Sequence, residues 1–320
     1  MTDLGYCLTS ELHAPREMVE YARLAEDAGF RLALISDHYH PWTSRQGHSP
    51  FVWGVIGGIA QATNELTLGT GVTCPTIRIH PAIVAQAAAT ASLMLEGRFF
   101  LGVGSGENLN EHILGHRWPP AAVRQDMLEE AVAVMRMLWT GDFVLHHGDH
   151  YTVENARVYD APEGGSLPVY VAAGGPKSAA LAGRIGDGFI GVAPKKGNLE
   201  VFDTEGGRGK PKLGQLHVCW AESRDAAIKT AHELWPNVAI TGEAGQELPM
   251  PGHFAQLAAM VSPEDVDEVV ACGPDPGRHM EMIKRFEDAG YTHIYVHQIG
   301  SDQEGFFRFY EREILPQFTS

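Results

Sequence analysis

Short apolar runs alternate with amphipathic stretches along almost the whole chain of 320 residues. The runs "LALIS", "LTLGTGVT" and "RFFLGVGSGE" are typical of buried strands, whereas "PREMVEYARLAEDAGF" and "PAIVAQAAATASLML" have the pattern of helices. About eight such strand–helix pairs predict a (β/α)8 TIM barrel, with a doubly wound parallel sheet as the alternative.

A sequence pattern that occurs twice in the chain favours the barrel. "AEDAGFRLALISDH" and "FEDAGYTHIYVHQI" both indicate a helix, Ala-Gly, an aromatic residue, a strand and a polar strand end. Polar clusters also recur directly after Ser36, Val72, Val103, Val171 and Val296. In a barrel these clusters converge on one mouth, at the carboxyl ends of the strands, where TIM-barrel active sites lie.

We expect one domain over residues 1–320, with two segments that interrupt the alternation. The pattern "DFVLHHGDHYTV" predicts a hairpin inserted between barrel elements. Residues 236–262 contain three prolines, three glycines and little strand pattern. We interpret this second segment as an insertion or lid near the mouth.

Charge and cysteine content exclude several classes of partner. The chain has 40 acidic and 24 basic residues, a net charge of −16, which argues against a nucleic-acid or membrane partner. No apolar run reaches the roughly 18 residues of a membrane span, and no signal peptide is recognisable. The four cysteines (Cys7, Cys74, Cys219 and Cys272) have neither CxxC nor zinc spacing, so we expect reduced thiols in a cytoplasmic protein.

The stretch "ISDHYHPW" places two imidazoles, a carboxylate and an indole directly after a predicted strand. His38 would act as a proton acceptor or donor, since imidazole titrates near neutral pH, and Trp42 would form a wall of the site. The alternative is a capped loop whose histidines and tryptophan only cover the barrel.

The stretch "VGSGENLNE" lacks the last glycine of a dinucleotide fingerprint, because Glu107 stands in its place. NAD is therefore disfavoured. Glycines here would let a flat ring approach the backbone, with Glu107 and Asn110 reaching into the site, or the segment is only a turn and a helix cap. Cys74, in "TGVTCPT", is interpreted as lining a pocket rather than as a nucleophile.

The stretch "VAAGGPKSAALAGRI" predicts a strand, two glycines and a helix N-terminus, which together can seat a phosphate. The Walker Lys-Ser/Thr pair is absent, and an ordinary βα turn is the alternative. Lys195 follows the next strand and could contact an anion. His112 and His116 have a metal-compatible spacing, but solvated histidines are favoured and no metal site is expected.

Jointly, several motifs carry a resemblance that runs nearly from end to end: "LGYCLTSE", "SDHYHPW", "GHSPFVW", "VTCPTIRIHPA", "GRFFLGVGSGENLNEH", "VYVAAGGP" and "GDGFI". The chain resembles the luciferase-like (β/α)8 oxidoreductases, and within them the coenzyme F420-dependent glucose-6-phosphate dehydrogenase branch. The resemblance implies hydride transfer between C5 of the deazaflavin and an alcohol, carbonyl or sugar substrate. It also implies a homodimer, and two predicted helices, "FVWGVIGGIAQAT" and "PAIVAQAAATASLML", are apolar on more than one side.

The resemblance also implies roles for individual residues. A non-prolyl cis peptide would join Gly71 and Val72 behind the coenzyme ring. The catalytic set would surround the reacting carbon: His38, Glu107, Trp42 and Glu11. The remaining coenzyme contacts would come from Asp37, Cys74, Ser105 and Asn110 around the ring system and from Ala172, Ala173, Gly174 and Gly175 around the phosphate.

The substrate side departs from the glucose-6-phosphate pattern. Lys195 matches one of the phosphate-binding cations, but Glu268 and Met282 align with the other two. A carboxylate there would repel a phosphate dianion, so we do not expect selectivity for glucose 6-phosphate.

Three other functions stay open from the sequence. The first is FMN in the same fold, as a monooxygenase or reductase. The second is a metal-dependent hydrolase that uses Asp37, His38 and His40. The third is a flavin-binding barrel without turnover.

Overall fold

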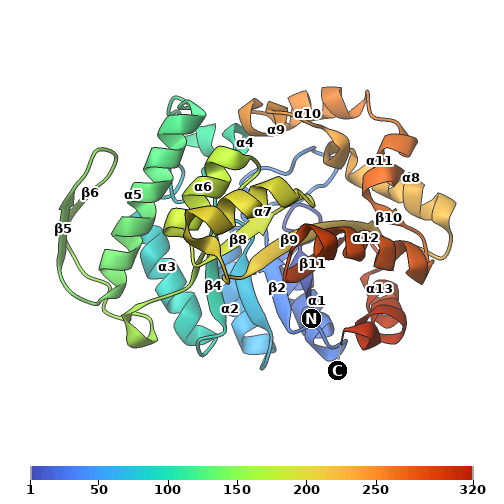
Figure 1. The fold of residues 1–320 in the computed structure, drawn as a ribbon, viewed down its shortest axis with the longest axis horizontal. Coiled ribbons are helices and arrows are strands. Elements are labelled where there is room, and N and C mark those ends of the chain that lie inside the picture. The colour runs from blue at the N-terminus through green and yellow to red at the C-terminus, as the bar shows by residue number, and fades with distance from the viewer. Residues whose placement is uncertain (1, 319–320) are drawn as a thin grey trace.

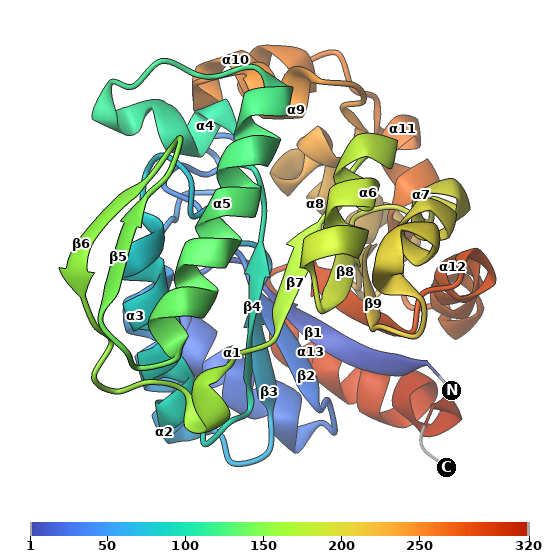
Figure 2. The same ribbon diagram turned by 60° about the vertical axis from the view of Figure 1, so that its left-hand side comes forward.

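The computed structural model describes residues 2–318. Eight parallel strands form a closed barrel, which confirms the predicted (β/α)8 fold (Figures 1 and 2). Around the barrel the order is β1 (Asp3–Leu8), β2 (Leu32–Ile35), β3 (Thr67–Thr70), β4 (Phe99–Val103), β7 (Val169–Ala172), β8 (Gly188–Gly191), β9 (Lys212–Cys219) and β11 (His293–Gln298). Pairing between β8 and β9 closes the ring, and β10 (Ala271–Cys272) adds a short strand beside β9.

Helices cover the outside of the barrel. They are α1 (Pro15–Asp27), α2 (Val52–Ala62), α3 (Pro81–Met94), α5 (Ala121–Trp139), α6 (Pro176–Ile185), α7 (Lys196–Phe202), α8 (Arg224–Leu234), α11 (Pro263–Val269), α12 (Pro276–Ala289) and α13 (Gln303–Phe309). Several begin with proline, whose fixed φ suits the first helical turn and whose missing N–H has no partner there anyway. Their apolar faces pack on the outward side chains of the strands and form the main core.

The lumen of the barrel is filled by a separate apolar cluster. Its buried members are Cys7, Leu32, Leu34, Phe100, Ile190, Leu213 and Tyr295. Gly69 is essential to this packing, because a Cβ on it would lie 2.1 Å from the ring of Phe100. A filled lumen leaves only the two ends of the barrel as places for a site.

Both segments that interrupt the alternation lie outside the barrel. The predicted hairpin is the antiparallel pair β5 (Val144–His147) and β6 (Thr152–Ala156), which lies beside α5 in Figure 2. Residues 236–262 contain a 3-10 turn, Pro236–Ala239, and two helices, α9 (Ala244–Glu247) and α10 (Pro251–Ala258). In both views α9 and α10 lie at the end of the molecule opposite the start of β1, near α4 (Asn108–Glu111). They therefore sit at the carboxyl ends of the strands.

Candidate active site

His38 lies just beyond β2, between two carboxylates. Its Nδ1 is 3.6 Å from Oε1 of Glu11, and its Nε2 is 3.6 Å from Oε2 of Glu107. The His38 side chain is only 12% exposed. Burial works to lower the pKa of His38, but the charges of Glu11 and Glu107 outweigh it, so the pKa is raised. This imidazole therefore keeps its proton to a higher pH than an ordinary histidine does.

Two serines hold the carboxylate of Glu11 in place. Its Oε2 accepts hydrogen bonds from Oγ of Ser36, at 2.5 Å, and Oγ of Ser10, at 3.2 Å. The side chain is only 2% exposed. Because both donors bond to one oxygen, the other oxygen of Glu11 is left to face His38.

Glu107 faces His38 from the loop after β4. Burial raises the pKa of Glu107 to about 7, against the opposing effect of His38. Nδ2 of Asn110 donates to Oε2 of Glu107, at 3.2 Å, and Oδ1 of Asn110 accepts from the backbone N–H of Tyr39 and His40, at 2.9 and 3.1 Å. Asn110 thus ties the His38 loop to Glu107.

Trp42 forms an aromatic wall beside His38. The ring centroids of His38 and Trp42 are 5.2 Å apart. On its other side Trp42 contacts Phe254 of α10 edge to face, at 5.1 Å. The segment 236–262 therefore reaches the histidine through this indole.

Asp37 belongs to a buried charge cluster that sequence reasoning missed in part. Its Oδ1 accepts from Nη2 of Arg78 and its Oδ2 from Oγ1 of Thr73, both at 2.8 Å. Nε of Arg78 lies 3.5 Å from Oε1 of Glu111, whose other oxygen accepts from the backbone N–H of Ile77 and Arg78. The cluster links the loops after β2, β3 and β4. An arginine two residues after "CPT" was its only sequence signal.

The coenzyme residues expected after β3 and β4 lie together. The Gly71–Val72 peptide bond is cis, which confirms that prediction. A Cβ on Gly104 would lie 2.8 Å from Val72 and 3.8 Å from Sγ of Cys74, so these loops are in contact. Burial raises the pKa of the Cys74 thiol well above its usual value, so Cys74 is no thiolate nucleophile at neutral pH. Ser105 is half-buried beside them.

The predicted phosphate seat lies at the carboxyl end of β7. Ala172 ends this strand, Ala173 follows it, and Gly175 is the N-cap of α6. Nothing lies within 4 Å of a Cβ built on Gly174 or Gly175, so the backbone there is open to a ligand. Nζ of Lys195 donates to the carbonyl of Gly174, at 3.2 Å. Open backbone, a helix N-terminus and a lysine fit an anionic phosphate.

Two residues expected at the substrate side are elsewhere. Met282 is buried in the main core, on α12, and Glu268 is exposed on α11. The structure therefore does not support the idea that they fill a seat for the substrate phosphate. Within residues 2–318 no three His, Cys, Asp or Glu side chains come together as a metal site, so Asp37, His38 and His40 form no ligand set.

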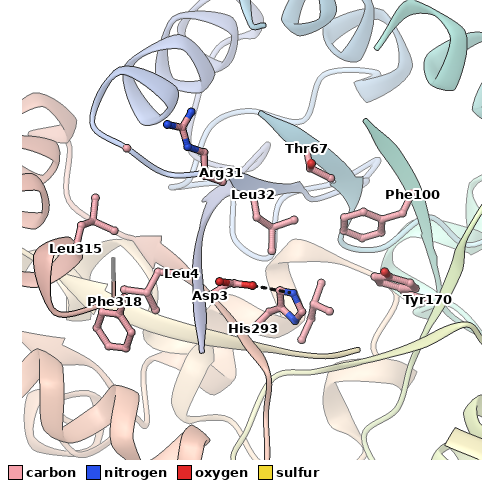
Figure 3. Close-up of a pocket in the computed structure, with 12 residues that line it drawn as sticks. Asp3, Leu4, Arg31, Leu32, Thr67, Phe100, Tyr170, His293, Leu315 and Phe318 are labelled. Carbon is pink, nitrogen blue, oxygen red and sulfur yellow. Dashed lines mark ion pairs between the residues drawn. The ribbon is translucent and has the colours of Figure 1, made fainter. Parts of the chain in front are cut away.

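The opposite end of the barrel has a hollow of about 350 Å³ (Figure 3). Leu32, Phe100, Tyr170 and Leu213 are among the residues that line it. The ion pair Asp3–His293, at 3.4 Å, lies at its edge. This hollow is at the amino ends of the strands and contains none of the predicted site residues, so we place the candidate active site at the other mouth.

Comparison with known proteins agrees with this geometry. The family model described as luciferase-like monooxygenase matches residues 2–293. An F420-dependent glucose-6-phosphate dehydrogenase of Microbacterium testaceum is 36% identical, over 98% of this chain and 96% of that protein. The enzyme of the same name from Rhodococcus erythropolis is also 36% identical, over 99% and 98%.

Solved structures show the same similarity. An F420-dependent secondary alcohol dehydrogenase, in complex with an F420-acetone adduct, has a TM-score of 0.93 and 30% identity, covering 100% of this chain and 99% of that one. A coenzyme F420-dependent tetrahydromethanopterin reductase from Methanopyrus kandleri has a TM-score of 0.81, with coverage of 99% of both chains. At 23% identity, this second structure shows the fold alone.

Proposed function

The chain belongs to the luciferase-like monooxygenase family, and we propose that it is a coenzyme F420-dependent oxidoreductase acting on an alcohol or carbonyl substrate. One observation carries this proposal. His38, held between Glu11 and Glu107, lies at the same mouth of the barrel as the phosphate seat at Gly174 and Gly175. A proton-handling group and a phosphate seat are what a hydride-transferring coenzyme of this kind needs from the protein.

The coenzyme assignment is supported by the similar proteins. Relatives 36% identical over nearly their whole length are named for F420 dependence, and so is the solved alcohol dehydrogenase at 30% identity. Ala172, Ala173, Gly174 and Gly175 would hold the coenzyme phosphate, and the Gly71–Val72 segment, Cys74, Ser105 and Asn110 would surround its ring. Lys195, which the sequence placed on the substrate side, donates to the carbonyl of Gly174, so we assign it to this phosphate seat instead. When bound, the deazaflavin supplies the carbon that accepts or donates the hydride.

The protein's part in the reaction is to move a proton. We assign to Nε2 of His38 the exchange of the hydroxyl proton of the substrate, because Nδ1 donates to the backbone carbonyl of His40, at 3.2 Å, and the carboxylates of Glu11 and Glu107 stabilise the imidazolium. Glu107, with its pKa at about 7, can share that proton or serve N1 of the coenzyme. The indole of Trp42, whose ring centroid lies 5.2 Å from that of His38, would shield the ring from water.

The substrate is more simply explained as uncharged than as a phosphate ester. Arg78 is neutralised by Asp37 and Glu111, and Lys195 bonds to the phosphate seat. Glu11 and Glu107 would repel a dianion near His38. We therefore propose a neutral alcohol, carbonyl or sugar rather than glucose 6-phosphate.

We assign to residues 236–262 the role of a lid. Phe254 contacts Trp42, and the carbonyl of Glu247 accepts from Nδ2 of Asn108 next to Glu107, at 2.9 Å. The carboxylate of Glu247 also lies 3.3 Å from the buried guanidinium of Arg124. These contacts hold the segment over the mouth, where it would exclude water during hydride transfer.

Homodimerisation is part of the proposal. Phe51, at the start of α2, and Ile83, on α3, are 64% and 58% exposed although both are large and apolar. A second hollow beside Phe51, lined in part by Val19 and Val55, extends this apolar surface. Gel filtration of the purified protein should give twice the 34.8 kDa of the chain, whereas elution as a monomer would refute the dimer.

A cytoplasmic location remains part of the proposal as well. It is supported by the four cysteines, which are all free, three of them buried. None of the helices in residues 2–318 has the length and apolar character needed to cross a bilayer.

Titration with F420 and, in parallel, with FMN tests the coenzyme. Micromolar F420 should bind one to one and lose its fluorescence on binding, and FMN should bind far more weakly. Tight FMN binding with no response to F420 would replace the proposal with a flavin enzyme, and binding of neither would refute it. The protein with F420 bound should then be screened with alcohols, sugars and sugar phosphates for reduction of F420.

A further inference from the structure

A second pair of histidines lies inside the barrel, outside the machinery described so far. His217 on β9 and His297 on β11 are register partners, and their Nδ1 atoms are 2.9 Å apart. Leu213 and Tyr295, an even number of residues before them on the same strands, point into the lumen. Because side chains alternate along a strand, both imidazoles also point into the lumen.

The histidine pair opens toward the same mouth as His38. Neither ring lines the hollow at the amino ends of the strands, and Leu213 and Tyr295, both 1% exposed, lie below them. The ring of Trp235 packs beside both imidazoles, with its centroid 4.5 Å from that of His297 and 6.3 Å from that of His217. Trp235 and Trp42 pack in one apolar cluster, so this cluster joins the pair to the wall of His38.

The two rings differ in what they can bind. His297 is fully buried, and its Nε2 has no hydrogen-bond partner among the described residues. His217 is half-buried, and its Nε2 is accessible, without a bond to any described residue. Burial lowers the pKa of His217 to about 4 and holds the pKa of His297 well below its usual value, so both rings are neutral at pH 7.

A single proton must lie between the two Nδ1 atoms, which fixes opposite tautomers on the two rings. A buried N–H without a partner is rarer in proteins than a buried acceptor without one. His297 therefore carries its proton on Nδ1 and donates it to His217. His217 in turn carries its proton on Nε2, where it faces the mouth as a hydrogen-bond donor.

We infer that His217 determines specificity by donating this N–H to an uncharged oxygen of the substrate other than the oxygen on the reacting carbon. The inference rests on the proposed function, in which His38 takes the reacting oxygen. In the barrel β1 and β11 separate β2 from β9, so the two imidazoles approach a substrate from different sides. The substrate class is thus a neutral diol, polyol or hydroxyketone.

The surroundings favour a neutral partner for His217. The other ionisable group acting on His297 is His13, which burial also keeps neutral, with a pKa lowered to about 4. Gln215, the next lumen residue on β9, is uncharged and donates to Sγ of Cys7, at 3.6 Å. Among the described residues, His13, His297 and Gln215 thus offer no charge to a substrate, whereas a hydroxyl would find a donor in His217.

Kinetics on a matched pair of alcohols test the inference. 2-Pentanol and 1,4-pentanediol share the secondary carbinol and differ in the remote hydroxyl. The wild-type enzyme should prefer the diol in kcat/KM by about tenfold, the value of one neutral hydrogen bond. His217→Phe keeps a ring without the N–H and should abolish this preference, chiefly through KM, whereas His217→Gln should restore part of it. An unchanged preference in His217→Phe would overturn the inference.

Imidazole NMR gives a readout that does not need turnover. Long-range ¹H–¹⁵N spectra of full-length protein labelled with ¹⁵N-histidine, with and without F420, should show His217 protonated on Nε2 and His297 on Nδ1. His217→Gln and His297→Gln assign the signals. 1,4-Pentanediol should shift the His217 Nε2 signal more than 2-pentanol does. The reverse tautomers, or equal responses to both alcohols, would refute the inference, whereas failure of F420 to bind would refute only the proposed function.

Discussion

The two ends of the barrel are built from the same eight strands but have opposite character. At the carboxyl end, Glu11, Asp37, Glu111 and Arg78 are all buried, and His38 lies among them. At the amino end, the hollow is walled mainly by apolar side chains and its charges are exposed. Both members of the pair Arg31–Glu65, for example, are 66% exposed.

The difference separates stability from function. Exposed ion pairs contribute little, because water screens them. Buried charges are costly and persist only when they are partnered. At the carboxyl mouth the buried charges are partnered by Arg78, Thr73, Ser36 and Asn110. Because packing alone does not require buried charges, we attribute their presence to function. Breaking equivalent contacts at the two ends should therefore have very different effects.

The largest effect should come from Arg78→Met. Removing this guanidinium leaves the carboxylates of Asp37 and Glu111 buried without a counter-charge. The free energy of unfolding should fall by about 3–5 kcal/mol, measured by urea denaturation. A loss below about 1 kcal/mol would mean that the cluster is solvated and the contrast between the ends is wrong.

The next effect concerns turnover. His38→Ala should reduce F420 reduction at least about a hundredfold while F420 still binds, because the proton acceptor is lost. His293→Ala, at the amino end, is the matched control and should leave turnover within about twofold. Steady-state kinetics of both variants check this, and unchanged turnover in His38→Ala would exclude its proposed role.

A smaller effect is expected in the pH profile. In alcohol oxidation His38 must be neutral to accept a proton, so kcat/KM falls at low pH. Glu107→Gln removes one of the two carboxylates that raise the pKa of His38, which lowers this pKa. The pH at which kcat/KM falls on the acidic side should therefore move down by about one unit. Glu65→Gln is the control, and a pH that stays in place or moves upward in Glu107→Gln would contradict the assignment.

The smallest effect should follow Arg31→Met, the counterpart of Arg78→Met at the other end. Its partner Glu65 is as exposed as Arg31 itself. We expect a change in unfolding free energy of no more than about 1 kcal/mol and unaltered kinetics. A loss as large as that of Arg78→Met would remove the distinction between the two ends.

Periodicity predicted the parts of the molecule that local sequence determines. Apolar runs indicated the strands, and the polar residues at the strand ends placed His38 and Glu107 at one mouth. The hairpin and the start of α6 at the two glycines also followed from local signals.

Contacts between distant segments were not predictable in this way. The Arg78 cluster needs the loops after three strands to meet, and the His217–His297 bond depends on the register of β9 with β11, strands that lie far apart in the sequence. Phe254 reaches Trp42 across more than two hundred residues of sequence. In hindsight, a histidine at an inward position of both "LHVC" and "YVHQ" was the available signal for the lumen pair.

Isotope transfer tests the central claim most directly, namely that the carboxyl mouth moves a hydride between a carbinol carbon and F420. The enzyme should be given the best alcohol substrate, deuterated at the carbinol carbon, and the reduced F420 examined by mass spectrometry and NMR. The account predicts that reduced F420 carries one deuterium at C5. Wild-type protein and His293→Ala should produce this labelled F420, and His38→Ala should produce hardly any. Reduced F420 without deuterium, or no reduction with any alcohol, would contradict it.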